Sequence, residues 1–465
     1  MIMQHGLSRL LGLLLLALAL GITGCGEIDP EASTASIKDD LHYICAPTHD
    51  EDGSRPYPFE GILEWTPDGL QLIVGHGDSI WAVDSGGAWA REIADADSGY
   101  ALINGYYADL SPAGTQVVYS TCAYATEGIK EISQRGGIPG RIKYNYEIDV
   151  TNLTGTRQKR LTENAYSDHF PVWSPDGSRI AFIANPRSPD PRFLRWEWRN
   201  LEVYTMAADG SDVRLVASTL QSGQEFYYWH TKADATRRKV ERGEKIEDSE
   251  DAWLGAVSLV PPAWSPDGRR LAFQVHDDRS GAKYHPIYLY TVDLDEPELQ
   301  RVAEDLMSVA SWSPDGQRLA FAKFAGGGDN VALVTLAADG SDEKLIASIA
   351  SHGIHEGYVT WIPTVSWSRD GTQILYSCNS GACVVNVEDG KVIELSGERT
   401  KWNQGAYLAV WSPDGTRIAL YKPAYRDTPP QLYTVTPDGT DRRDLIRLVN
   451  DDNLVPANPP RQDES

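Results

Sequence analysis

Short apolar runs follow one recurring polar turn along most of the chain. Examples are residues 180–183, 271–273 and 418–421, each of which begins within a few residues of a glycine. Runs this short, bounded by turn residues, predict β-strands rather than helices. The turn before each run has the form Trp-Ser-Pro-Asp-Gly, in which proline presets the first corner and glycine accepts a positive φ. Each copy therefore predicts a β-hairpin.

A second set of apolar runs follows the first, so that each repeat contains four strands. The turn phrase occurs seven times, four times in this form and three times with one or two substitutions, and its glycines are Gly69, Gly114, Gly177, Gly268, Gly316, Gly371 and Gly415. The later runs occupy residues 80–83, 146–150, 203–206, 287–290, 331–334, 383–387 and 432–435. Most of them lead into an Asp-Gly turn and a further run, such as residues 212–216. Because the shortest repeat is about 44 residues long, the sequence predicts an all-β, seven-bladed β-propeller with four-stranded antiparallel blades.

The repeats resemble those of the TolB-type propeller family, also called WD40-like or PD40 repeats. The resemblance is carried by Pro171-Val-Trp-Ser-Pro-Asp-Gly177, the following Arg-Ile-Ala-Phe and Val-Tyr-Thr-Met segments, and the Asp-Gly turn; it extends over residues 59–448. It implies that the tryptophan, serine and turn residues are structural. The Gly-His and Trp-Asp dipeptides of true WD40 repeats are absent at blade spacing. TolB also has an N-terminal α/β domain, whereas the first blade is expected here soon after Cys25, so TolB's own partners are not carried over.

The first 24 residues predict an export signal. One basic residue, Arg9, precedes an apolar run at residues 10–20 that is too short to span a bilayer comfortably. The residues before Cys25 resemble a bacterial lipobox, which implies cleavage and lipidation of Cys25; the alternative is an ordinary secretory cleavage site. We expect residues 1–24 to be the signal peptide, residues 25–58 the lipidated N-terminus, tether and lead-in, and residues 449–465 a C-terminal tail.

Composition and charge narrow the class of partner. The 41 glycines and 27 prolines are typical of a folded, turn-rich protein. With 42 Lys+Arg against 66 Asp+Glu, the formal net charge is −24, which repels a phosphate backbone and argues against nucleic-acid binding.

The insertions fall on one predicted face. The Pro-Asp-Gly and Asp-Gly turns keep nearly constant length, and the chain is longer at residues 121–145, 185–200, 219–262, 276–286, 351–364 and 398–408. Insertions confined to one face of a repeat protein commonly mark its binding face. The candidate contact residues there are Tyr106, Tyr107, Trp196, Trp198, Tyr228, Trp229, Trp253, His355, Tyr358, Trp361, Trp402 and Tyr407. Aromatic residues are enriched in binding hot spots, although they also pack long loops.

Signals for catalysis are poor. The sequence contains no Gly-x-Ser-x-Gly, no His-Glu-x-x-His, no phosphate-binding loop and no paired-cysteine zinc spacing. Propeller-capped serine peptidases need an α/β-hydrolase domain, for which we expect no counterpart. Histidines and carboxylates that could gather at a channel mouth are Asp168, His169, His352, His355 and Glu356. We expect no catalytic residue, no metal and no cofactor.

The remaining cysteines predict two disulfides in an oxidising compartment. Cys378 ends one expected strand and Cys383 begins the next, with residues 379–382 as a four-residue loop, so their Cα atoms should lie opposite one another. Cys45 and Cys122 are left to pair with each other; four unpaired thiols are the alternative.

These patterns predict a monomeric, lipid-anchored protein of the bacterial cell envelope. We expect it to act as a non-enzymatic binding or scaffold module for an envelope protein or peptide, with the lipid as its only membrane attachment. The alternative is a propeller enzyme or small-ligand binder that uses a metal or a His/carboxylate site at the axial channel.

Overall fold

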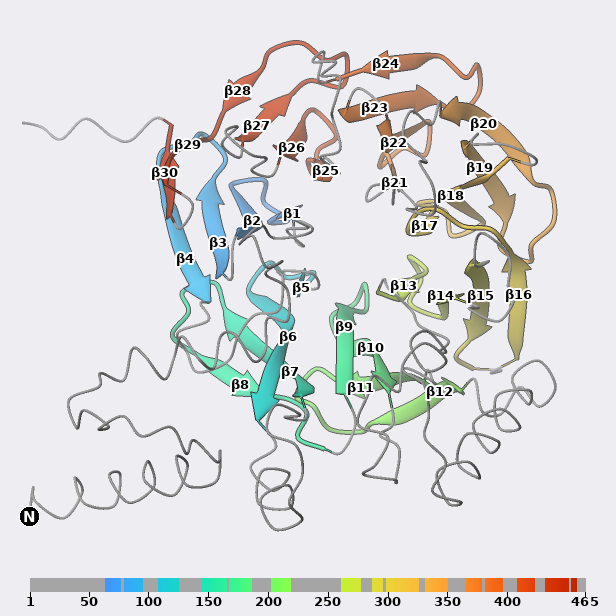
Figure 1. Cartoon of the computed structure of the whole chain (residues 1–465), viewed down its shortest axis with the longest axis horizontal. Helices are drawn as coiled ribbons and strands as arrows, with labels where there is room; N and C mark the ends of the chain where they lie inside the picture. The colour runs from blue at the N-terminus through green and yellow to red at the C-terminus, as the bar shows by residue number, and fades with distance from the viewer. Residues whose placement is uncertain are drawn as a thin grey trace, which may run out of the picture.

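The described part of the chain forms a ring of seven sheets. The structure is a computed structural model that describes residues 63–76, 79–94, 108–124, 144–164, 167–185, 202–218, 261–276, 287–295, 298–325, 331–349, 365–378, 381–395, 408–422, 431–450 and 453–457. In these ranges the secondary structure is entirely β, and seven four-stranded antiparallel sheets surround a common axis (Figure 1). The predicted seven-bladed β-propeller is therefore confirmed.

Each blade is a simple meander in which the first strand is innermost. Blade I holds β1 (Leu63–Trp65), β2 (Gln71–His76), β3 (Ser79–Asp84) and β4 (Ala90–Ala94); blade II holds β5 (Ala108–Leu110), β6 (Gln116–Tyr124), β7 (Tyr144–Asn152) and β8 (Gln158–Arg160). Blade III holds β9 (Ser167–Trp173), β10 (Arg179–Asn185), β11 (Glu202–Ala207) and β12 (Arg214–Ser218); blade IV holds β13 (Ala263–Trp264), β14 (Arg270–His276), β15 (Ile287–Asp293) and β16 (Leu299–Ala303). Blade V holds β17 (Ser311–Trp312), β18 (Arg318–Phe324), β19 (Val331–Ala337) and β20 (Lys344–Ile349). Blade VI holds β21 (Val365–Trp367), β22 (Gln373–Cys378), β23 (Gly381–Asn386) and β24 (Val392–Glu394); blade VII holds β25 (Leu408–Trp411), β26 (Ile418–Lys422), β27 (Gln431–Val435) and β28 (Arg443–Asp444).

The apolar core is divided among the seven seams between blades. Successive residues of a strand point to opposite faces of its sheet, and both faces of a blade are covered by neighbours. In β2, for example, Ile73 packs in the seam between blades I and II, whereas Leu72 and Val74 pack in the seam between blades VII and I. This is why the strand sequences read as continuous apolar runs instead of alternating with polar residues.

The recurring turn phrase is held by its serine and aspartate. In blade III the Ser174 hydroxyl donates to Asp176 Oδ1 (2.6 Å) and accepts the Arg179 backbone N–H (2.9 Å). Gly177 has φ 70°, the left-handed conformation that the sequence pattern requires. The Ser174 hydrogen bond lowers the pKa of Asp176, which keeps the carboxylate ionised and available as an acceptor. The same hydroxyl-to-aspartate bond forms in every copy except that of blade II, where Ala113 replaces the aspartate and Ser111 accepts backbone N–H groups alone, so the phrase fixes the start of the second strand.

Tryptophans of the phrase link each blade to the one before it. At four consecutive seams, from III–IV to VI–VII, the indole Nε1 donates to a backbone carbonyl of the preceding innermost strand. The pairs are Trp264 to Val172 (3.2 Å), Trp312 to Ala263 (3.1 Å), Trp367 to Ser311 (3.2 Å) and Trp411 to Ser366 (3.4 Å). The tryptophans are therefore packing residues, as the sequence predicts.

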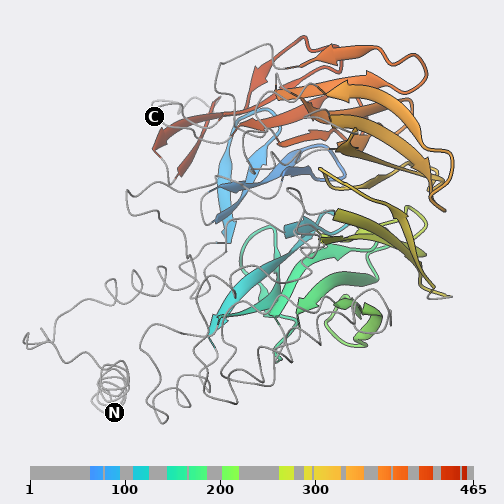
Figure 2. The same ribbon diagram turned by 45° about the vertical axis from the view of Figure 1, so that its right-hand side comes forward.

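The seam between blades VII and I closes differently. Trp65 Nε1 is buried there and, in the described part of the chain, meets no acceptor. Instead Leu445 and Ile446, just after β28, join the apolar cluster of this seam. They lead into a hairpin of β29 (Ile446–Asn450) and β30 (Asn453–Pro456), and β30 contacts β4 of blade I. Figure 2 shows the same closure obliquely, with the blue strands of blade I beside the red strands. Contacts added after the seventh blade therefore close the ring.

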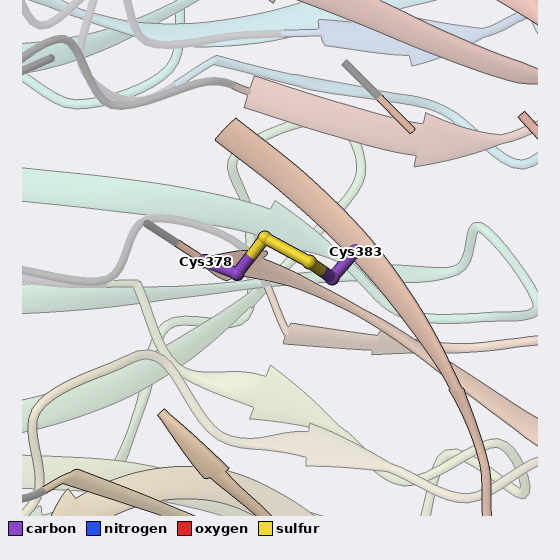
Figure 3. Close-up of a disulfide and its surroundings, with 2 residues drawn as sticks. All are labelled: Cys378 and Cys383. Atoms are coloured by element: carbon purple, nitrogen blue, oxygen red, sulfur yellow. A yellow bond between two sulfur atoms is a disulfide. The ribbon is translucent and has the colours of Figure 1, made fainter. Parts of the chain in front are cut away.

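One disulfide lies within blade VI. The Sγ atoms of Cys378 and Cys383 are 2.06 Å apart, with their Cα atoms 5.8 Å apart (Figure 3). The expected four-residue loop is wrong: Cys378 pairs with Gly381 and Cys383 pairs with Tyr376, so the two cysteines lie diagonally across a tighter hairpin. Gly381, with φ 113°, accepts the backbone conformation that this tighter connection needs. Cys45 and the side chain of Cys122 lie outside the described residues, and their pairing stays a prediction.

Gly87 provides a test of the closing contact. A Cβ atom at Gly87 (φ 73°) would lie 2.9 Å from the carbonyl oxygen of Leu445. Gly69 has nearly the same φ, 70°, and open space around it. We expect Gly69→Ala to cost about 1 kcal/mol, the cost of the left-handed conformation, and Gly87→Ala about 2 kcal/mol more because of the collision. Urea unfolding measures both values. Equal losses in the two variants would show that Leu445 does not brace blade I.

Candidate functional site

Connection lengths separate the two ends of the propeller. In a meander blade the β1–β2 and β3–β4 type turns lie at one end, where they remain short in every blade, as at residues 66–70 and 85–89. The β2–β3 type and interblade connections lie at the other end, which we call the loop face. The longest of these, residues 125–143, 186–201 and 219–262, leave or enter blades II and III. Blades II and III therefore carry the longest connections of the loop face.

The predicted contact residues themselves lie outside the described residues. This applies to Tyr106, Tyr107, Trp196, Trp198, Tyr228, Trp229, Trp253, His355, Tyr358, Trp361, Trp402 and Tyr407, and also to Cys25, His352 and Glu356. Of the histidines and carboxylates named from the sequence, Asp168 and His169 are described. Both belong to β9, close to where residues 186–201 leave β10, because Asp168 pairs with Ala184 and Ser167 pairs with Asn185.

A buried carboxyl cluster joins blades II and III beneath these connections. Glu147 of β7 is 2 % exposed and Asp168 is 0 % exposed. The Thr162 hydroxyl donates to Glu147 Oε2 (2.8 Å), and Asn164 reaches both acids. The Asn164 backbone N–H donates to Glu147 Oε1 (3.3 Å), and its Nδ2 donates to Asp168 Oδ2 (2.7 Å). The short 161–166 connection therefore arranges the two carboxyl groups around Asn164.

Burial controls the protonation of this cluster. Loss of water, together with a smaller effect of the nearby Asp168 charge, raises the pKa of Glu147 to about 7 against the lowering effect of the Thr162 hydrogen bond. Burial likewise raises the pKa of Asp168 to about 6, although the Asn164 hydrogen bond and the nearby Thr162 hydroxyl oppose it. Burial lowers the pKa of His169 to about 3, so its imidazole is neutral at pH 7. The His169 ring packs against Tyr146, with ring centroids 4.3 Å apart.

Sequence reasoning identified Asp168 and His169 but missed Glu147 and its partners. The available signal was the pair of acids at Glu147 and Asp149 in an otherwise apolar strand, where two-residue spacing places both on one face. Asp149 is also buried and is paired with Arg160 (Nε to Oδ1, 3.0 Å).

A second carboxyl pair lies on the innermost strands of blades I and II. Glu64 Oε2 accepts the Leu110 N–H (2.9 Å), and Asp109 Oδ2 accepts the Trp173 N–H (2.5 Å). The two carboxyl groups also hydrogen-bond to each other. Burial raises the pKa of Glu64 well above its usual value, with the Asp109 charge adding to the effect, and raises the pKa of Asp109 to about 6. The pair links the first three innermost strands, where no tryptophan-to-carbonyl bond forms among the described residues.

The described ranges contain neither a metal-binding group of three or more side chains nor a membrane-spanning helix. There, no group of three or more His, Cys, Asp and Glu side chains is placed to hold a metal ion. In the same ranges no helix is long and apolar enough to cross a membrane.

Comparison with known proteins supports the fold. No family model matches the chain. A curated relative, dipeptidyl-peptidase 5 of Porphyromonas gingivalis, is 23% identical over 362 residues, which cover 63% of this chain and 49% of the relative. The chain thus spans about half the length of that relative.

Solved structures show the same architecture at low identity. An oligogalacturonate lyase in complex with manganese has a TM-score of 0.53 and 13% identity, covering 80% of this chain and 87% of the lyase. The oligogalacturonate lyase of Vibrio parahaemolyticus has a TM-score of 0.50 and 11% identity, with 82% and 90% covered. TolB of Acinetobacter baumannii has a TM-score of 0.38 and 14% identity, with 80% and 77% covered. At identities this low, structural likeness supports the fold alone and leaves the activity open.

The Glu64–Asp109 pair gives a pH prediction. Folding raises both carboxyl pKa values, so the native state holds more protons than the unfolded chain, and the pair loses stability as pH rises through the folded values. Glu64→Gln keeps a donor for Asp109 without the second charge. We expect its unfolding free energy, relative to wild type, to rise by about 1 to 2 kcal/mol between pH 5 and pH 8.

Urea titrations at several pH values measure this difference. Glu304→Gln, which changes an exposed carboxylate, is the control and should show no such trend. A Glu64→Gln variant that tracks wild type at every pH would rule out a shared proton.

Proposed function

We propose that this protein is a lipid-anchored, TolB-type propeller of the bacterial cell envelope that binds another envelope protein through its loop face. The observation that carries the proposal is the segregation of connection lengths. Short turns hold one end of every blade, while the extra chain is concentrated at the other end around blades II and III. Repeat proteins commonly place binding residues in such insertions, because the rigid blades position them without depending on their sequence.

Two observations support the proposed location in the cell envelope. The N-terminal sequence has the order of a lipoprotein signal, ending at Cys25. The Cys378–Cys383 disulfide favours an oxidising compartment outside the cytoplasm. Two or more acyl chains on Cys25 would give a stable attachment to a membrane surface.

An enzyme or small-ligand binder acting near the ring axis is the second candidate. The Glu64–Asp109 pair favours it, since two adjacent carboxyl groups with raised pKa values are typical of acid–base sites. Because the fold resembles that of an oligogalacturonate lyase, oligogalacturonate is the substrate to test. Cleavage of oligogalacturonate by the purified protein, lost in Asp109→Asn, would favour this candidate over the binding module.

Shortening the longest connection tests the binding role. Replacement of residues 221–251 by a short Gly-Ser linker should leave the thermal midpoint within a few degrees, because long surface loops contribute little to stability. Recovery of the partner from solubilised envelopes, measured by pull-down with the tagged propeller, should fall at least severalfold. The control is Leu345→Ser on the outer strand of blade V, where Leu345 is 65% exposed. Undiminished recovery with the shortened loop, in a protein that still folds, would exclude this connection as the binding element.

Cys25→Ala tests the anchor. The variant should lose acylation in metabolic labelling and move from the membrane fraction to the soluble fraction, because its attachment site for lipid is gone. Cys45→Ala leaves the lipobox intact and should remain with membranes. Retention of label by Cys25→Ala would show that the lipid is attached elsewhere.

A further inference from the structure

Asp168 has one carboxylate oxygen without a partner. Oδ2 accepts the Asn164 amide at 2.7 Å, but Oδ1 is fully enclosed and accepts no hydrogen bond within the described part of the chain. The residue is 0 % exposed, so bulk water does not solvate that atom. A buried carboxylate oxygen left unmatched costs more than a typical hydrogen bond contributes. This arrangement indicates that another species contacts Oδ1.

The surrounding charges are negative in balance. Glu147 shares Asn164 with Asp168, so two carboxyl groups lie beside one amide. Arg160 is a cation in this region, and it is paired with a third acid, Asp149. Fully ionised, the described groups therefore leave two negative charges at Glu147 and Asp168, which matches the charge of one divalent cation.

Protonation of Asp168 alone does not account for the missing hydrogen-bond partner of Oδ1. A proton on Oδ1 would need an acceptor of its own, because a buried hydroxyl left unpaired is as costly as a buried acceptor left unpaired. A proton on Oδ2 would compete with the Asn164 amide that already donates there. A small cation, in contrast, can contact Oδ1 while leaving both Asn164 hydrogen bonds in place.

We propose that Asp168 and Glu147 bind an oxygen-coordinated divalent cation of the calcium, magnesium or manganese class between blades II and III. Asp168 Oδ1 and a Glu147 carboxylate oxygen are its charged ligands. Hard divalent cations prefer such oxygens and complete their coordination with neutral oxygens, so a third charged side chain is not required. Thr162 and Asn164 are positioning residues that hold the two carboxylates.

Blade III contains a matched position without such a site. Glu202 precedes its outer turn glycine by the same spacing as Glu147 does in blade II. Both of its carboxylate oxygens are occupied: Ser218 Oγ donates to Oε1 (3.2 Å) and Tyr204 OH donates to Oε2 (2.7 Å). Both oxygens of Glu147 are hydrogen-bonded as well, so what distinguishes blades II and III is Asp168 Oδ1, the one buried carboxylate oxygen among the described residues that accepts no hydrogen bond.

The bound cation would tie together β7, the 161–166 connection and β9 next to the point where residues 186–201 leave blade III. It would therefore stiffen the part of the loop face that carries the long connections. This inference concerns the ion alone and does not depend on which partner the loop face binds.

Metal-dependent unfolding of the full chain tests the proposal. After treatment with EDTA and buffer exchange, the thermal midpoint should rise by about 2 to 5 °C with millimolar CaCl₂, MgCl₂ or MnCl₂, because ligand binding to the folded state stabilises it. Isothermal titration of the preferred ion should give about one site per chain. Asp168→Asn and Glu147→Gln should each lose at least tenfold in affinity, while Glu202→Gln should bind like wild type.

Two results would overturn the proposal. One is a midpoint that no ion changes in wild type, together with an Asp168→Asn variant at least as stable as wild type, which would identify Asp168 as a neutral structural acid. The other is equal binding by wild type and both carboxyl variants, which would place the ion elsewhere. If Asp168→Asn fails to fold, the comparison of Glu147→Gln with Glu202→Gln decides the question.

Discussion

Burial of apolar surface between adjacent blades is the interaction on which this molecule depends. No blade has a core of its own, since residues such as Ile73 pack toward one neighbour and Leu72 and Val74 toward the other. A single four-stranded sheet would expose both of these faces, and the exposed area is removed only when seven sheets form a closed ring. Short turns and continuous apolar strands both follow from this requirement.

The seams share a packing principle but differ in their polar connections. Four seams use an indole N–H donating to a backbone carbonyl, which is neutral and insensitive to pH. The first two seams use carboxyl groups at Glu64 and Asp109, which carry a proton whose presence depends on conditions. The second of these seams also contains the Glu147–Asp168 cluster. Among the described residues, the carboxyl groups with raised pKa values therefore lie in blades I to III, and blades II and III also carry the longest connections.

The sequence predicted the repeat well because the determinants of a hairpin are local. Proline, aspartate and glycine at fixed spacing specify a turn wherever they occur, and the seven copies specify the blade number. Contacts between blades are harder to predict from the sequence, because they depend on which residues of two separate strands come into register. Glu64 and Asp109 are far apart in sequence, and nothing near either residue reveals the other. The Cys378–Cys383 hairpin shows the same limit at short range: the bond was predictable from proximity, but the diagonal pairing depends on the register of β22 and β23.

The packing of the seam between blades VII and I determines when blade I can become stable during synthesis. Blade I is synthesised before the other six blades, yet one of its apolar faces is covered only by blade VII and by Leu445 and Ile446, which follow all seven blades in the sequence. During synthesis, Leu72, Val74 and Trp81 therefore stay uncovered until blade VII and residues 445–446 have been made. This interval exposes a sheet face to aggregation and to chaperones. The ring can close only after residues 445–446 have been made, so a segment that follows the seventh blade sets the time at which the first blade becomes stable.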